Sequence, residues 1–383
     1  MKSKRKICFV VTARASYSRI LSAIQETKKN KKLTVNVVTT GPFNSKNFGV
    51  SSKILKKDKI KIDHSFTSLI TTDSIESSPK TTAIQILELS TYFKNQKPDI
   101  VVTIADRYET ISTAIAASYM NITLVHVQGG EVTGNIDEKV RHSITKLADY
   151  HFVSNNDAKK RVVKMGEKSN SVFVTGCPSI DLAKKIITKR KKNKFELDGV
   201  GAKIDLDKDY LVVMNHPDTY DFKSARINTN KILDAVKKIN IQTIWFWPNP
   251  DLGTDSVSEA IRAFREKNKN SKILFVKNLE PQTFLQLLSN SRCLIGNSSV
   301  GIRECALMGL PVVNIGKRQM RRIRSNNVLD VDEKTNKIIN GIKKQIKQKK
   351  FKKSYIFGSG NSGIKISKLL ANIELKNYKQ ITY

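Results

Sequence analysis

Residues 122–142 read ITLVHVQGGEVTGNIDEKVRH, and the rest of the chain is organised around this stretch. It begins as an apolar run, passes through two adjacent glycines and a group of acids, and enters a segment with helical spacing. An apolar run followed by a glycine-bearing loop and a helix is typical of the βα unit of a parallel sheet. The stretch therefore predicts an α/β fold in which the loop lies at the carboxyl end of a strand.

The helical part of this stretch carries acids and bases on neighbouring turns. Asn135 or Asp137 is suited to capping the helix, because short polar side chains accept hydrogen bonds from the free N–H groups at a helix start. Glu138 is spaced to reach both Arg141 and His142. Such a group is suited to proton transfer, but surface helices with an ordinary ion pair share the spacing. The stretch alone leaves both interpretations open.

Composition limits the classes of protein to consider. The 383 residues suffice for two domains, and the formal net charge is +34. Such a charge can indicate binding to nucleic acid, but the lysines are spread along the whole chain and form no single patch. We therefore expect no nucleic-acid partner, although a positive surface attracts anionic small molecules such as sugar nucleotides.

The cysteines and the N-terminal segment favour a cytoplasmic location. The four cysteines are far apart and form no C-x-x-C pair, so we expect buried free thiols and no zinc site. The apolar run near the N-terminus is short and is broken by Arg14, which argues against a signal peptide. No apolar run reaches the roughly eighteen residues that a membrane span requires, so we expect no membrane partner.

Two further strands of the first half end in charged residues. The predicted strand at 7–12 leads to Arg14, and the one at 100–104 leads to Asp106 and Arg107. Ligands of open parallel sheets gather beyond the carboxyl ends of the strands, so these residues and the 126–137 loop are expected to face one crevice. The alternatives are that Arg14 is a solvated loop residue and that Asp106 caps a helix. No G-x-G-x-x-G motif follows the first strand, which excludes the dinucleotide signature there.

A second series of strands follows a charged, poorly periodic stretch at 189–208. Strands are predicted at 210–214, 242–246, 273–276, 292–295 and 311–315. After the fourth of these, the free backbone N–H groups and the hydroxyls of Ser298 and Ser299 suit a diphosphate, Glu304 suits ribose hydroxyls, and Arg318 suits a phosphate. A capped helix start beside surface cations is the alternative. We place the domains at 1–188 and 189–365, with a C-terminal helix and tail at 366–383.

Seven segments occur in a specific order along the chain: TARASY at 12–17, ADRYE at 105–109, GGEVTGNIDEKVRHSITKL at 129–147, GCPSID at 176–181, WPNPD at 247–251, GNSSVGIRE at 296–304 and IGKRQ at 315–319. In these segments the chain resembles the hydrolysing UDP-N-acetylglucosamine 2-epimerases. These enzymes open bacterial sialic-acid synthesis and form the epimerase half of the animal bifunctional enzyme. The likeness covers nearly the whole chain.

This resemblance implies a glycosyltransferase-B (GT-B) fold, an α/β architecture of two Rossmann-like doubly wound parallel-sheet domains facing across a cleft that holds the nucleotide-sugar substrate. It also implies no metal and no redox cofactor, and we expect a cytoplasmic homo-oligomer, either a dimer or a tetramer. The substrate-binding residues that we carry over or add from the residue pattern are Arg14, Arg107, Arg141, His142, Asn249, Ser298, Ser299, Glu304 and Arg318.

The implied reaction converts UDP-N-acetylglucosamine to free N-acetylmannosamine and UDP, for sialic-type acid synthesis. A base removes the C2 proton, UDP leaves C1 by anti elimination to give a 2-acetamidoglycal, and water then adds. Asp106 and Asp137 match the family's catalytic acids and are the candidates for proton transfer. Arg14, Arg318 and His216 would stabilise the departing diphosphate, and we include His216 in the catalytic set.

One position departs from the family pattern. Many members carry H-I-E-G-G-E with a catalytic glutamate, whereas this chain has Gln128 at that place, and an amide is no proton acceptor. Either Gln128 orients water or sugar while another acid takes its role, Glu131 being nearest, or the substrate differs. Related hydrolysing epimerases act on 2,4-diacetamido-2,4,6-trideoxy sugars carried on UDP or GDP, on legionaminic-type routes. A GT-B glycosyltransferase, a basic nucleic-acid-binding protein and an inactive nucleotide-sugar sensor are the competing functions.

Overall fold

The structure is a computed structural model that describes residues 4–45, 52–71, 74–189, 195–249, 251–376 and 378–382. The chain forms two compact units. Unit 1 comprises residues 1–131, 136–182 and 357–383, and unit 2 comprises residues 132–135 and 183–356. The sequence placed the boundaries after 188 and 365. In the structure the chain instead leaves unit 1 after 182 and returns at 357, so that the C-terminal helix is part of unit 1.

Unit 1 is built on a seven-stranded parallel sheet with the order β3-β2-β1-β4-β5-β6-β7. Its strands are β1 (Arg5–Val11), β2 (Leu33–Thr39), β3 (His64–Ser65), β4 (Ile100–Ile104), β5 (Thr123–Val127), β6 (Tyr150–Val153) and β7 (Val172–Val174). Its helices are α1 (Arg14–Lys29), α2 (Ser52–Lys57), α3 (Ser77–Gln96), α4 (Ile111–Tyr119), α5 (Asp137–Leu147), α6 (Asn156–Lys164), α13 (Ser362–Asn372) and the first part of α7 (Pro178–Lys189). The strands predicted at 7–12 and 100–104 are confirmed.

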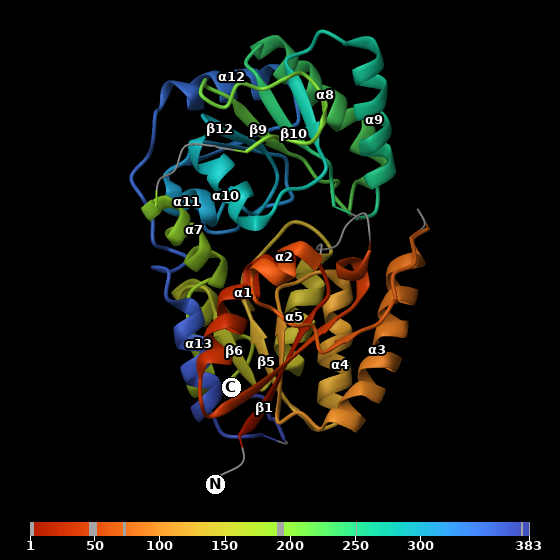
Figure 1. The fold of residues 1–383 in the computed structure, drawn as a ribbon, viewed down its shortest axis with the longest axis vertical. Coiled ribbons are helices and arrows are strands. Elements are labelled where there is room, and N and C mark those ends of the chain that lie inside the picture. The colour runs from red at the N-terminus through yellow and green to blue at the C-terminus, as the bar shows by residue number, and fades with distance from the viewer. Residues whose placement is uncertain are drawn as a thin grey trace. The chain divides into compact units, whose positions relative to one another are not determined.

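Helices cover both faces of this sheet, which explains why its central strands are continuously apolar. Every residue of β4 and β5 is buried. On one face α1 packs beside α13 (Figure 1), with Ile20 and Ile24 of α1 and Ile366 and Leu370 of α13 in the core. On the other face α3, α4 and α5 contribute buried apolar residues that include Leu89, Phe93, Ala117 and Ile144. The C-terminal helix thus completes the core of unit 1.

The C-terminal tail is fixed to the end of α5. Lys379 Nζ donates to three backbone carbonyls there, at 2.6–3.1 Å, and lies 2.7 Å from Glu167 Oε2. Glu167 also accepts from Lys146 at 2.6 Å and pairs with His151 at 3.0 Å. Burial alone would raise the pKa of Glu167, but the hydrogen bonds from these three side chains lower it to about 2. The tail therefore stabilises the helix whose first turn carries Asp137.

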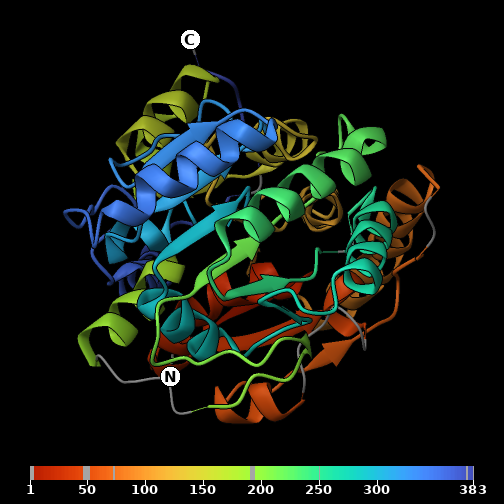
Figure 2. The same ribbon diagram turned by 90° about the horizontal axis from the view of Figure 1, so that it is seen from above.

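Unit 2 has a second seven-stranded sheet, ordered β14-β13-β12-β9-β10-β11-β8, in which β8 alone is antiparallel. Its strands are β8 (Val200–Gly201), β9 (Leu211–Met214), β10 (Thr243–Phe246), β11 (Ile273–Val276), β12 (Cys293–Gly296), β13 (Val312–Ile315) and β14 (Val328–Val331). Its helices are α8 (Ala225–Ile239), α9 (Thr254–Lys267), α10 (Pro281–Asn290), α11 (Glu304–Met308) and α12 (Thr335–Lys347). Helices α8 and α12 lie side by side over one face of the sheet (Figure 2). The five strands predicted in this half are confirmed.

Each sheet has one point at which the strand order reverses. In unit 1 the chain proceeds outward from β1 on one side and from β4 on the other, and in unit 2 the corresponding neighbours are β9 and β12. Open α/β sheets bind ligands beyond the carboxyl ends of the strands at such a reversal. Arg14 follows β1, Asp106 follows β4, His216 follows β9 and Ser298 follows β12. The topology thus brings four predicted site residues to the binding edges of the two sheets.

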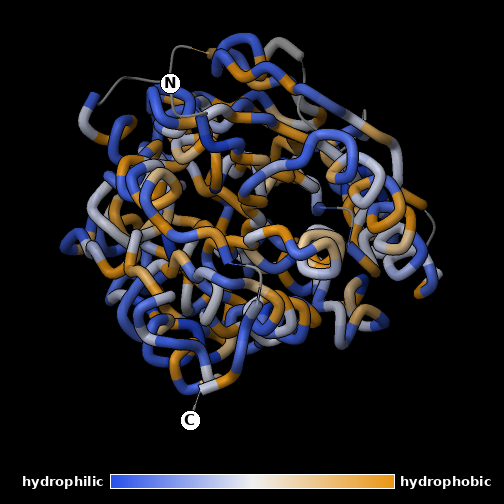
Figure 3. Tube along the Cα trace, turned by 90° about the horizontal axis from the view of Figure 1, so that it is seen from below, coloured by the Kyte–Doolittle hydropathy of each residue, from blue (hydrophilic) through white to orange (hydrophobic). Residues whose placement is uncertain are grey.

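The distribution of hydrophilic residues along the chain agrees with the composition. Hydrophilic segments recur along the whole chain and are not confined to one region (Figure 3). All four cysteines are buried and free, as predicted. Among the described residues, no helix is long and apolar enough to cross a membrane.

Candidate active site

Asp106 and Arg141 form the centre of a charged cluster in unit 1. The Asp106 carboxylate accepts a charge-assisted hydrogen bond from the Arg141 guanidinium and lies 3.6 Å from Arg19 NH1. The whole of Arg141 is buried, and Asp106 is 5% exposed. Burial opposes the charge on Arg141, but Asp106 outweighs this effect and raises the pKa of Arg141. Arg107 occupies the cap position of the 3-10 helix at 108–110, and its side chain makes no cap hydrogen bond.

Arg141 also ties the loop after β5 to helix α5. Its NH1 donates to the backbone carbonyl of Glu131 and to Glu138 Oε2, both at 2.9 Å. Glu138 Oε1 pairs with His142 Nε2 at 3.0 Å, so the predicted position of Glu138 near both partners is confirmed. The Asp106 strand end and the 126–137 loop therefore lie together, as predicted.

The predicted cap of α5 is wrong. Ile136, and neither Asn135 nor Asp137, occupies the cap position, and its side chain makes no cap hydrogen bond. Asp137 and Glu138 instead lie in the first turn, where their negative charge is favoured by the positive end of the helix dipole.

Gln128 and Glu131 are buried at the end of β5. Gln128 is 1% exposed, and its Nε2 donates to Cys177 Sγ at 2.7 Å. Its Oε1 has no hydrogen-bond partner among the described residues. The backbone φ of Gln128 is +68°, a left-handed conformation that costs free energy for a residue other than glycine. Glu131 Oε1 accepts from Ser154 Oγ at 2.7 Å.

Two arginines that follow the first and fourth strands, Arg14 and Arg107, lie close enough to repel one another. Burial and then repulsion from Arg107 lower the pKa of Arg14 to about 10. Arg107 Nε donates to Glu109 Oε1 at 2.8 Å, and the same carboxylate oxygen accepts from Thr12 Oγ1 at 3.3 Å. Two cations that repel one another in a partly dry site favour the binding of an anion. The structure therefore supports Arg14 as more than a solvated loop residue.

In unit 2, His216 and Asn297 lie just beyond the ends of the adjacent strands β9 and β12 and form two hydrogen bonds with each other. The backbone N–H of His216 donates to Asn297 Oδ1, and Asn297 Nδ2 donates to the His216 carbonyl, both at 2.8 Å. The N–H of Asn249 donates to Nδ1 of His216 at 3.3 Å. With Nδ1 accepting, the neutral ring carries its proton on Nε2, which is then a hydrogen-bond donor.

Arg318 lies near this pair, and both Arg318 and Glu304 have part of their hydrogen-bonding capacity unused. Arg318 NH1 donates to the Asn297 carbonyl at 3.3 Å, and NH2 lies 3.9 Å from Asp251 Oδ2. Its Nε has no hydrogen-bond partner in the part of the chain that the structure describes, and the same holds for the buried Oε2 of Glu304. Both groups are therefore available to a ligand that brings an acceptor and a donor.

The loop after β12 differs from the prediction. The sequence suggested free backbone N–H groups, but those of residues 300–303 bond within the loop to Ser298 and Ser299, at 3.1–3.5 Å. Tight turns use these four donors internally, so the prediction of N–H groups free for a phosphate is wrong for residues 300–303. Gly296 precedes this loop with a φ of +127°, and a Cβ there would lie 2.1 Å from the Met214 carbonyl. Only glycine allows β12 to end this close to β9.

The predicted residues are divided between the two units. The unit 1 group comprises Arg14, Asp106, Arg107, Gln128, Glu131, Asp137, Arg141 and His142, and the unit 2 group comprises His216, Asn249, Ser298, Ser299, Glu304 and Arg318. Sequence reasoning missed Arg19, Ser154 and Asn297. Asn297 stood inside a quoted motif directly after a strand, and Arg19 lies on the helix that begins at Arg14, so both had a signal. Ser154 had only its position after β6.

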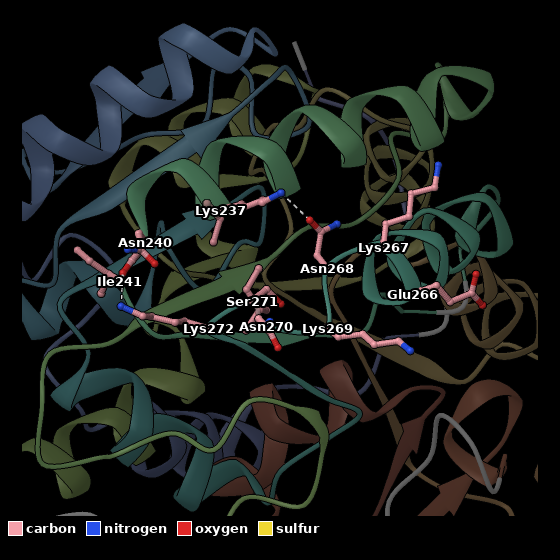
Figure 4. A pocket seen from close by; sticks show the side chains of 12 residues that line it. Lys237, Asn240, Ile241, Glu266, Lys267, Asn268, Lys269, Asn270, Ser271 and Lys272 are labelled. Atoms are coloured by element: carbon pink, nitrogen blue, oxygen red, sulfur yellow. Dashed lines mark hydrogen bonds between the residues drawn. The ribbon is translucent and has the colours of Figure 1, made fainter.

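Neither a metal centre nor the pocket at the ends of α8 and α9 adds a described residue to the candidate active site. Among the described residues, no group of three or more His, Cys, Asp or Glu side chains is arranged to hold a metal ion. A pocket of about 520 Å³ lies where α8 and α9 end (Figure 4), and its lining contains none of the predicted site residues. Lys237 and Lys267 lie in the last turns of these helices, and Lys237 Nζ donates to Asn268 Oδ1 at 2.6 Å. Lysines at helix C-termini stabilise the helix dipoles, which accounts for the charge of this pocket.

Comparison with known proteins decides the family. Residues 25–371 match the family described as UDP-N-acetylglucosamine 2-epimerase. The chain belongs to the UDP-N-acetylglucosamine 2-epimerase family. It is 31% identical over 371 residues to the UDP-N,N'-diacetylbacillosamine 2-epimerase (hydrolyzing) of Legionella pneumophila, covering 97% of each chain. It is 34% identical over 331 residues to the GDP/UDP-N,N'-diacetylbacillosamine 2-epimerase (hydrolyzing) of Campylobacter jejuni, covering 86% of this chain and 84% of that protein.

Solved structures of this family share the fold. The enzyme of Neisseria meningitidis bound to UDP-GlcNAc has a TM-score of 0.76 at 20% identity, covering 96% of this chain and 100% of that chain. The enzyme of Methanocaldococcus jannaschii in complex with UDP-GlcNAc and UDP has a TM-score of 0.80 at 18% identity, covering 95% and 99%. At this identity the likeness shows the fold alone. The GT-B fold predicted for this epimerase family member is confirmed.

Proposed function

We propose that the chain is a hydrolysing 2-epimerase, which converts a UDP-linked 2-acetamido sugar to the free 2-epimer and UDP. The observation that carries this proposal is the buried Asp106–Arg141–Glu138 network at the strand-order reversal of unit 1. A glycosyltransferase of the same fold needs nucleotide contacts but has no need for such a group of acids in its first domain. Family membership supports the 2-epimerase part of the proposal independently.

The proposed reaction uses the two groups of residues for different tasks. The C2 proton of the sugar is weakly acidic, so its removal needs a positioned carboxylate, and Asp106 and Asp137 match the family's catalytic acids. The diphosphate gains negative charge as the C1–O bond breaks, and preorganised cations stabilise that charge. In unit 2, Arg318 and the Nε2–H of His216 are the groups that we assign to this task.

For the sugar, we propose a 2,4-diacetamido substrate of the N,N'-diacetylbacillosamine type. The relatives from Legionella pneumophila and Campylobacter jejuni, at 31% and 34% identity, carry this specificity in their names. The UDP-N-acetylglucosamine 2-epimerase of Neisseria meningitidis is 26% identical over 359 residues, so UDP-N-acetylglucosamine, the substrate favoured by the sequence, becomes the second candidate. The buried, unpartnered Oε1 of Gln128 supports a substrate that donates a hydrogen bond there.

A time course by NMR in heavy water tests both parts of the proposal. The purified protein is incubated with UDP-N,N'-diacetylbacillosamine and, separately, with UDP-N-acetylglucosamine, with no acceptor present. We expect UDP and a free 2-epimer with deuterium at C2, faster from the diacetamido sugar. Faster turnover of UDP-N-acetylglucosamine would restore the second candidate. Release of UDP without epimerisation, or turnover only after an acceptor is added, would contradict the reaction itself.

A further inference from the structure

The segment Val132–Asn135 is part of unit 2, although the chain enters it from Glu131 and leaves it to Ile136, which both belong to unit 1. Two hydrogen bonds hold it there. The N–H of Gly134 donates to the Arg318 carbonyl at 3.1 Å, and Arg322 Nε donates to the Val132 carbonyl at 3.2 Å.

The contact at Gly134 has no room for a side chain. A Cβ at this position would lie 2.1 Å from the carbonyl oxygen of Lys317 and 3.3 Å from Met320 Cβ. The φ of Gly134 is not in the left-handed region, so backbone conformation does not require glycine here. The close approach of the Lys317 carbonyl is the reason why glycine fits this position.

Arg322 connects the segment to the nucleotide group of unit 2. It is 3% exposed, and its NH1 donates to Gln319 Oε1 at 2.9 Å. Gln319 Nε2 in turn donates to the Asn297 carbonyl at 2.9 Å, and Asn297 is bonded in both directions to His216. A continuous series of hydrogen bonds thus runs from the Val132 carbonyl to the residues that we assign to the diphosphate.

We propose that Gly134 and Arg322 are positioning residues, which hold the segment Val132–Asn135 and thereby the two acids that flank it in the chain, Glu131 and Asp137. This inference rests on the proposed function. Glu131 directly precedes the segment and Asp137 follows it by two residues, so a shift of the backbone at Gly134 moves both acids. When a diphosphate orders Arg318 and its neighbours, the segment Val132–Asn135 is ordered with them, because Gly134 donates to the Arg318 carbonyl.

Kinetics of matched variants test the inference. Arg322→Met removes the hydrogen bonds and keeps the length of the side chain, and the exposed Arg321→Met, one residue away in the same segment, is the control. A misplacement of about 1 Å reduces catalysis by up to ~100-fold, so we expect kcat to fall about 10- to 100-fold in Arg322→Met and in Gly134→Ala. The Kd for UDP should stay within about twofold, and Arg321→Met should match the wild type.

Other kinetic outcomes overturn the inference. Unchanged kcat in Arg322→Met would show that the contact does not position the acids. An equal loss of UDP affinity and kcat would make Arg322 part of the nucleotide site and not a positioning residue.

Amide hydrogen exchange of the unmodified protein tests the link between UDP binding and residues 132–141. It needs neither folded variants nor turnover. We expect saturating UDP to slow amide exchange in residues 132–141 as well as around Arg318. Slowed exchange without any turnover would refute the proposed reaction and leave the link intact. Turnover with UDP protection confined to the region around Arg318 would refute the link and leave the reaction intact.

Discussion

Replacing Arg141 with methionine is the perturbation for which the structure gives the clearest magnitude. The side chain is completely buried and donates to Asp106, to Glu138 and to the Glu131 carbonyl. Methionine fills much of the same apolar volume, so the change removes the charge and the donors with little added cavity. Removing one partner of a buried ion pair costs about 3–5 kcal/mol, because the other charge stays buried without compensation.

The surroundings place Arg141→Met at the lower end of this range. The Asp106 carboxylate keeps Arg19 at 3.6 Å, and Glu138, whose side chain is 30% exposed, remains in contact with water. We therefore expect a loss of about 3 kcal/mol, and the usual size dependence of about 2–4 °C per kcal/mol converts it to a Tm lower by roughly 6–12 °C.

A double-mutant cycle is the assay that isolates the pair. Arg141→Met, Asp106→Asn and the double variant are compared by calorimetry, and the unfolding transition that shifts is assigned to unit 1. Because the double variant lacks both charges, we expect it to be more stable than the sum of the single losses by about 2 kcal/mol. Losses that add to within about 0.5 kcal/mol would show that Asp106 and Arg141 do not interact as described.

Three other changes give distinct outcomes. Asp137→Asn is expected to lower kcat by at least about 100-fold while titration with UDP shows unchanged affinity, because an amide cannot take up the C2 proton; retained turnover would remove Asp137 from the mechanism. Gln128→Glu is expected to raise the ratio of kcat/KM for UDP-N-acetylglucosamine to that for the diacetamido sugar, and an unchanged ratio would show that Gln128 does not select the substrate. The lowered pKa of Glu167 stabilises the native state above the ordinary value of 4.5, and this contribution is lost as the pH falls from 4.5 toward 2. Thermal melts in this range should show a steeper loss of stability for the wild type than for Lys379→Ala, and equal slopes would contradict the assignment.

Much of the fold could be predicted because buried parallel strands are continuous apolar runs. The central strands of both sheets have this pattern, as in β4 and β5. The two-residue edge strands β3 and β8, and β14 at the opposite edge of the second sheet, carry no such pattern because edge positions are partly exposed. The domain boundary also escaped prediction, since it falls inside the continuous helix α7 and composition does not change there.

Some contacts of the candidate site could likewise be predicted from the sequence, and others could not. Helical spacing sufficed to place Glu138 beside Arg141 and His142, and the rule for strand ends sufficed to bring Asp106 near the 126–137 loop. The contact of Gln128 with Cys177 depends on side-chain orientation across 49 residues of sequence, for which no local pattern exists. The internal bonding of the loop after β12 depends on turn geometry, which the residue types alone do not determine.

Within the proposed reaction, these contacts narrow the choice of base. Gln128 cannot accept a proton, and the carboxylate of Asp106 is already hydrogen-bonded to Arg141 and faced by Arg19, which hold it in one orientation. Glu131 and Asp137 remain, and Glu131 is buried with its carboxylate on Ser154.

Asp137 is partly exposed at the start of α5, two residues beyond the segment that unit 2 holds. We infer that Asp137 removes the C2 proton, because of the two acids it is the one that is partly exposed. This inference requires Gly134→Ala and Asp137→Asn to share one kinetic signature, a lower kcat at unchanged UDP affinity. If Asp137→Asn retained the deuterium exchange at C2 and lost only the later addition of water, Glu131 would be the base instead.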